Sequence, residues 1–88
     1  MKYLITTPHT PSECLRALDE QAAKGKQMLK EFNYACMAGD HTGYAIVNVK
    51  DEKYARDLVP EFLRDKARIT KVDVFTPEEI RSMHAKAA

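Results

Sequence analysis

The chain of 88 residues contains no tryptophan, three glycines and two cysteines, and its charges almost balance. Its 14 Lys and Arg residues and 13 Asp and Glu residues give a net charge of +1, which does not favour nucleic acid as a partner. No apolar run approaches the roughly 20 residues of a membrane span, and the N-terminal stretch turns polar too early for a secretory signal. We therefore expect a cytoplasmic protein that binds neither nucleic acid nor membrane.

The two cysteines, Cys14 and Cys36, do not form a C-x-x-C pair, so the chain lacks that redox or zinc-knuckle motif. In a reducing compartment we expect free thiols rather than a disulfide. Cys14 falls in the first turn of the predicted first helix, where two interpretations stay open. It is either a reactive thiol or, as an apolar side chain, part of the buried stripe of that helix.

The remaining pattern predicts one α+β domain over residues 1–88. Stretches rich in β-forming residues predict strands at 2–7, 29–37, 43–49 and 67–75. Three helix start signals lie between or after them, at Thr10-Pro11, Asp51 and Thr76-Pro77. The order is that of a ferredoxin-like βαββαβ fold, an antiparallel four-stranded sheet of order 4-1-3-2 with both long helices on one face. A short C-terminal helix is expected at about 76–86.

Alternation along the strands predicts which side chains face away from the helices. If the hairpin pairs Met37 with Gly43, the helix-free face takes an apolar set: Tyr3, Ile5, Phe32, Tyr34, Tyr44, Ile46 and Ile69. Such a face is too apolar to remain in water. We therefore expect a homodimer, sheet against sheet, with a cavity lined by Tyr3, Phe32, Tyr34, Tyr44 and Ile46. The alternative is that the C-terminal helix folds back and covers the face with Ile80 and Met83.

Polar side chains gather at one end of this predicted sheet, because the first two strands end there and the hairpin turn joins them. The candidates for binding a ligand or a metal ion are His9, Cys36, Asp40 and His41. Imidazole, thiolate and carboxylate groups together are ligands for zinc or nickel. We therefore expect a small ligand or a metal ion at this rim, and Asp40 is alternatively only a turn-forming residue.

Two other functions stay open at this stage. The chain is alternatively a small cofactor-independent enzyme with His9 or His41 as general base, although no motif identifies a reaction. It is also alternatively a protein-interaction module that binds no small ligand.

The stretches TPHTP (7–11) and CMAGDHTGYAIV (36–47) resemble those of small ferredoxin-like proteins of the dimeric α+β barrel superfamily. That superfamily includes small monooxygenases, enzymes like muconolactone isomerase and nickel-binding proteins. The resemblance spans residues 2 to about 75 and implies a homodimer with facing sheets. Because its members differ in their catalytic residues, it points only to the rim positions His9, Cys36, Asp40 and His41. Without tryptophan, the Asn, Trp, His set of the haem-degrading monooxygenases cannot be completed.

Overall fold

The computed structural model describes residues 1–87 and has the α+β architecture that the sequence predicts. The strands are β1 (Lys2–Pro8), β2 (Asn33–Tyr34), β3 (Thr42–Asn48) and β4 (Arg68–Lys71). The helices are α1 (Cys14–Ala23), α2 (Lys26–Glu31), α3 (Glu52–Asp57) and α4 (Pro77–Ala87), with 3-10 turns η1 (Pro11–Glu13), η2 (Cys36–Ala38) and η3 (Glu61–Leu63). The strands pair antiparallel in the order β2-β3-β1-β4, which is the predicted order 4-1-3-2 read from the other edge. This arrangement is consistent with a ferredoxin-like fold.

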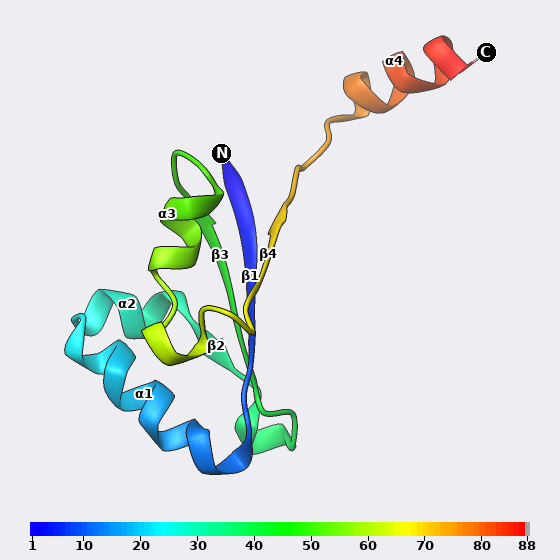
Figure 1. Cartoon of the computed structure of the whole chain (residues 1–88). Coiled ribbons are helices and arrows are strands. Elements are labelled where there is room, and N and C mark those ends of the chain that lie inside the picture. Colours follow the sequence, from blue (N-terminus) through cyan, green and yellow to red (C-terminus); the bar gives the residue numbers. More distant parts are fainter. Residues whose placement is uncertain (88) are drawn as a thin grey trace.

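The core lies between the sheet and the helices α1, α2 and α3, which share one side of it (Figure 1). In the centre of the sheet, Tyr3 pairs with Val47 and Ile5 with Ala45, and all four side chains are buried. The outward direction expected for Tyr3 and Ile5 was therefore wrong, whereas the inward direction expected for Ala45 and Val47 is confirmed. The reason is volume: β3 offers only small side chains on this side, so the larger residues of β1 must fill the core.

The register of β2 differs from the predicted hairpin and changes the face of two aromatic residues. Gly43 pairs with Tyr34 rather than Met37, a shift of three residues. An odd shift moves every side chain of a strand to the opposite face. Phe32 and Tyr34 therefore pack with the core, and the prediction that they line the open face was wrong.

The predicted second strand, residues 29–37, is mostly not a strand. Gly25 adopts a positive φ of 114° and starts α2 directly afterwards. The residues that follow are good helix formers, and the Gln27 side chain donates to Glu31 across one turn at 3.2 Å. Only Asn33 and Tyr34 then remain for the strand.

The open face, defined here by the side chains opposite α1, α2 and α3, keeps Leu4, Tyr44 and Ile46 as its apolar residues. Ile46 is 59% exposed and Tyr44 37%. The open face is thus much less apolar than the sequence predicts.

The C-terminal part forms an arm, residues 72–87, that stands clear of the sheet and ends in α4 (Figure 1). The predicted fourth strand continued to Phe75, but β4 ends at Lys71, with one further bond from the Val72 N–H to the Lys2 carbonyl. Strand β1 begins at Lys2, so no partner is left for the residues beyond. The predicted helix start at Thr76 is present, with reciprocal bonds of 3.2 Å between Thr76 and Glu79. None of the described helices has the length and apolarity to cross a bilayer.

Candidate metal centre

Four side chains from separate segments lie close together. The end of β1, the start of α1 and the loop before β3, which carry three of them, lie at the end of the sheet away from the N-terminus and α4 (Figure 1). His9 follows β1, Cys14 opens α1, Cys36 opens η2, and His41 precedes β3. One ligand atom from each residue lies within 4.8 Å of the others. This His/Cys cluster could hold a metal ion.

His9 is the most buried member and is fixed by two bonds. His9 is only 8% exposed, and its ring atom Nδ1 lies 3.1 Å from the Thr7 carbonyl. A carbonyl only accepts, so Nδ1 carries the hydrogen and Nε2 of the neutral ring keeps a free lone pair. That lone pair faces the Cys36 sulfur at 3.4 Å. A histidine whose one nitrogen donates to a backbone carbonyl is oriented as metal-ligating histidines are.

His41 is hydrogen-bonded to His9 through the backbone, and one nitrogen of its ring has no hydrogen-bond partner among the described residues. The His9 N–H donates to the His41 carbonyl at 3.0 Å, and the two ring centroids are 6.1 Å apart. Within the described part of the chain, Nδ1 of His41 is buried without a hydrogen-bond partner. Leaving such a group unpaired costs about 1–3 kcal/mol. This unpaired nitrogen points to a ligand that would satisfy it.

The two sulfur atoms, Sγ of Cys14 and Sγ of Cys36, are 2.9 Å apart. Burial first, and then the adjacent Cys14, raise the pKa of the Cys36 thiol to about 11. Without a metal, Cys36 is therefore a neutral thiol at pH 7. A bound cation would reverse this preference, because it stabilises the thiolate.

Cys14 is positioned by the residues just before it. The Glu13 carboxylate accepts the Thr10 N–H at 2.8 Å and an ammonium bond from Lys66 at 3.1 Å. The Thr10 bond, and then the Lys66 bond, lower the pKa of Glu13. These contacts connect the start of α1 to the loop before β4, so Cys14 sits on an anchored turn.

A closely packed layer lies beneath the cluster. The Tyr34 ring meets the His9 ring edge-on at 6.3 Å, and burial raises the pKa of Tyr34 to about 12. Gly43 leaves room for the Tyr34 ring, because a Cβ at position 43 would lie 2.6 Å from the Thr7 hydroxyl and 2.8 Å from that ring. The Thr7 hydroxyl in turn donates to the Gly43 carbonyl at 3.3 Å.

Asp40, a ligand candidate from the sequence, lies outside the cluster. Its two carboxylate oxygens accept the hydroxyls of Thr42 and Tyr44, each at 2.7 Å. The Tyr44 bond, and then the Thr42 bond, lower the pKa of Asp40. The structure thus gives Asp40 the turn-forming position that was the alternative prediction.

Cys14 takes the fourth position instead, and sequence reasoning did not include it among the candidates. The available signal was that the chain has only two cysteines and that this one begins the helix directly after the rim. The sequence alone leaves Cys14 either a reactive thiol or part of the apolar stripe of the first helix.

The four ligand atoms lie within 4.8 Å of one another, and two of their separations can be compared with those of a tetrahedral zinc ion. Zn–S bonds of about 2.3 Å and Zn–N bonds of about 2.0 Å put neighbouring ligand atoms roughly 3.3–3.8 Å apart. The separation of 3.4 Å between His9 Nε2 and the Cys36 sulfur is within that range. The two sulfur atoms, 2.9 Å apart, would have to separate by about 0.9 Å to reach that geometry.

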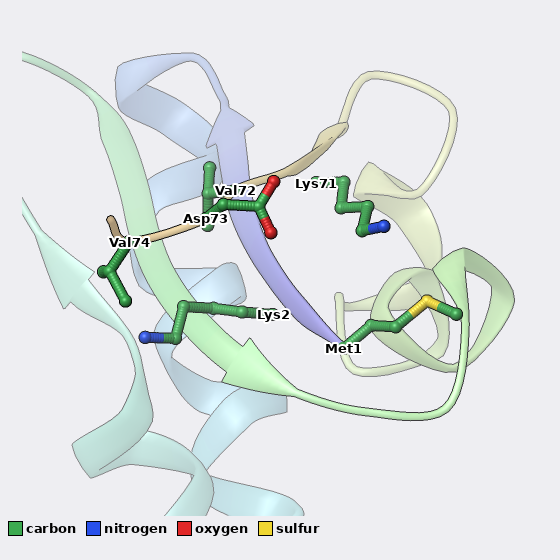
Figure 2. Close-up of a pocket in the computed structure, with 6 residues that line it drawn as sticks. All are labelled: Met1, Lys2, Lys71, Val72, Asp73 and Val74. Atoms are coloured by element: carbon green, nitrogen blue, oxygen red, sulfur yellow. The ribbon is translucent and has the colours of Figure 1, made fainter. Parts of the chain in front are cut away.

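The structure also has a hollow at the opposite end of the sheet, where the arm leaves it (Figure 2). It has a volume of about 330 Å³ and is lined by Met1, Lys2, Lys71, Val72, Asp73 and Val74. These residues include none of the cluster. The predicted cavity lining (Tyr3, Phe32, Tyr34, Tyr44 and Ile46) does not surround this hollow either.

Comparison with known proteins adds no relative to this description. No protein-family model matches the chain, and no curated protein or solved structure matches it. The resemblance to dimeric α+β barrel proteins therefore stays an expectation, and the functional conclusion depends on the geometry of the site.

Proposed function

We propose that this chain is a metal-binding protein and that His9, Cys14, Cys36 and His41 together hold one Zn²⁺ ion. The observation that carries the proposal is convergence: four ligand atoms of the types that bind zinc, from four separate segments, lie within 4.8 Å of one another. The unpaired Nδ1 of His41 and the carbonyl-bound ring of His9 support it.

The donor set favours zinc over nickel. Two thiolates and two imidazoles in tetrahedral array are typical of zinc, whereas Ni²⁺ prefers square-planar or tetragonal sites with nitrogen and oxygen ligands. Two thiolates also neutralise the charge of the ion, which suits a half-buried position. With four protein ligands no coordination position is left for a substrate, so the ion would serve structure or storage rather than hydrolysis.

The structural consequence is a connection between four segments that are far apart in sequence. A domain of this size buries only about 60% of the surface that its unfolded chain exposes, so its core alone gives a small free energy of unfolding. Because a complete site exists only in the folded chain, the free energy of metal binding adds to the free energy of unfolding.

The test is a titration of reduced, chelator-treated protein with Co²⁺ and then Zn²⁺. We expect the ligand-field absorption of tetrahedral cobalt with thiolate charge-transfer bands, and displacement of the cobalt by one equivalent of zinc. His9→Ala, Cys14→Ser, Cys36→Ser and His41→Ala should each weaken binding, by more than the roughly 10–100-fold that loss of an outer partner costs. Asp40→Asn is the control and should leave the spectrum unchanged. Octahedral cobalt, or equal loss in the Asp40 variant, would reject the site.

We also propose that the chain forms a homodimer, for a separate reason. Large apolar side chains are exposed on the arm, with Val74 at 74%, Phe75 at 55% and Met83 at 54%. On the open face Ile46 is 59% exposed. A second copy that packs against these surfaces would remove them from water.

Sedimentation velocity over a range of micromolar concentrations tests the dimer. We expect a concentration-dependent dimer in the wild type and a shift to monomer in Ile80→Ser with Met83→Ser. A wild type that sediments as a monomer throughout, and like the variant, would reject the dimer without affecting the metal proposal.

A further inference from the structure

The distance between the Cys14 and Cys36 sulfur atoms is intermediate between two chemical states. It is 2.9 Å, compared with about 2.05 Å in a disulfide and about 3.8 Å between two thiolates on a tetrahedral zinc ion. A change of less than about 1 Å in the sulfur–sulfur separation reaches the distance of either state. The same pair of side chains is therefore placed for a covalent bond as well as for a metal.

We propose that Cys14 and Cys36 form an oxidisable pair that peroxides convert to a reversible intramolecular disulfide, and that the site releases its metal in that state. No other cysteine exists in the chain to compete for the bond. The inference rests on the proposed zinc site for the release of metal, but formation of the disulfide itself does not.

The reaction balances with hydrogen peroxide as the oxidant. One cysteine sulfur attacks a peroxide oxygen, the O–O bond breaks, and water leaves after protonation, which produces a sulfenic acid. The second sulfur attacks the sulfenic sulfur, the S–S bond forms, the S–O bond breaks and a second water leaves. The two thiols together lose two electrons and two protons, and the peroxide gains both. At 2.9 Å the second sulfur is already adjacent to the first.

Release of the metal follows from the loss of ligands. After oxidation the cluster retains only His9 and His41, which are two neutral donors without the charges that balanced the ion. The thiolate, not the disulfide sulfur, is the metal ligand. Zinc affinity should therefore fall by well over about 100-fold, more than the loss of an outer partner costs.

The experiment follows three quantities in zinc-loaded, reduced protein exposed to hydrogen peroxide. Intact mass under non-reducing conditions should fall by two hydrogen atoms, with Cys14 and Cys36 joined in one cross-linked peptide. A colorimetric zinc chelator should detect one ion released per disulfide. A dithiol reductant should restore both the original mass and zinc binding.

Two variants separate the steps. His41→Ala keeps both thiols and should form the same disulfide although it binds zinc poorly. Cys14→Ser should gain oxygen on Cys36 or stay unmodified, without losing hydrogen. If wild type binds no zinc yet forms the disulfide, the metal function fails and the thiol pair stands.

Three results would overturn the redox inference. One is a gain of oxygen without any link between the two sulfurs. Another is a disulfide that joins two chains instead of closing within one. The third is zinc that stays bound at its original affinity after the disulfide has formed.

Discussion

The His/Cys end of the sheet and the helix of the arm differ in how their residues are held. At the end with the His/Cys cluster, contacts connect segments far apart in sequence, such as Lys66 with Glu13 and His9 with Cys36. At the end with the arm, the bonds of α4 are local, such as Thr76 with Glu79 and Arg81 with Glu78. The difference teaches that the side chains of the His/Cys cluster are placed by contacts between distant segments. The helix of the arm is held by bonds between residues close together in sequence.

Burial also differs between the cluster end and the arm, because polar groups are buried at the first and apolar groups are exposed on the second. The cluster end buries or half-buries polar groups, including Thr7, His9 and Thr42, while the arm exposes the apolar side chains of Val74 and Phe75. Buried polar groups need partners or a ligand, and exposed apolar groups need a covering surface. The four predictions below test whether each end has the partner that we assign to it.

The largest expected effect is stabilisation of the cluster end by zinc. At free zinc about 1,000 times above the Kd, the free energy of unfolding rises by about 4 kcal/mol. For a domain of this size that should raise Tm by more than about 15 °C. Thermal unfolding followed by circular dichroism, with and without zinc, measures the shift. Cys36→Ser, which should bind zinc more than about 100-fold more weakly, should lose most of the shift, and Met83→Ser, on the arm, should retain it; equal shifts in both variants would contradict the assignment.

A second prediction concerns the close packing beneath the cluster. Gly43→Ala places a Cβ 2.6 Å from the Thr7 hydroxyl and 2.8 Å from the Tyr34 ring, so these groups must move. Overpacking of this kind lowers the free energy of unfolding by about 1–3 kcal/mol. Urea denaturation measures it. The control change on the arm, Val74→Ala at a side chain that is 74% exposed, should stay within about 0.5 kcal/mol of wild type, and an equal loss there would remove the contrast.

A third prediction concerns pH. In the metal-free protein the Cys36 thiol is protonated below its pKa of about 11, and metal binding must displace that proton. Zinc affinity should therefore fall as the pH falls. Displacing this one proton makes the affinity about tenfold weaker for each pH unit, which is about 1.4 kcal/mol of binding free energy. Competition titrations against a chelator of known pH dependence measure the slope. Cys36→Ser should have a shallower slope, and an affinity independent of pH would exclude thiol ligands.

The smallest expected effect is on the stability of the arm variants. Ile80→Ser with Met83→Ser should change the free energy of unfolding of the monomer by no more than about 0.5 kcal/mol, because both side chains are exposed. The same change should weaken self-association. Urea denaturation at low protein concentration, beside sedimentation velocity, separates the two quantities. A loss of several kcal/mol in the monomer would mean that the arm packs on its own sheet.

Local signals predicted the helix starts well, and the βαββαβ succession of elements predicted the order of the strands. Asp51 accepts the Tyr54 N–H at 3.2 Å, and the Thr76 start of α4 is present as expected. Such signals act over a few residues, so the sequence displays them directly. The alternation of β3 is also predicted correctly, with Ala45 and Val47 buried and Tyr44 and Ile46 on the open face.

Register and face were harder to predict. The pairing of Tyr34 with Gly43 depends on α2, which shortens the strand before it, and no local pattern in 29–37 shows this. Tyr3 and Ile5 point inward because the opposite strand leaves volume there, which is a property of two strands together. Cys14 starts α1 directly after η1, and only the folded chain brings it to the cluster.

By itself, the sequence determined the helix caps, the strand order and the end of the sheet at which His9, Cys36 and His41 meet. The helix caps follow from hydrogen bonds over a few residues, and the strand order and the meeting end follow from the βαββαβ succession of elements. Only the tertiary structure decided that Cys14 belongs with them and that Asp40 does not. That outcome depends on where α1 starts relative to the turn before β3, to a precision of about 1 Å, and packing of the whole core sets that distance.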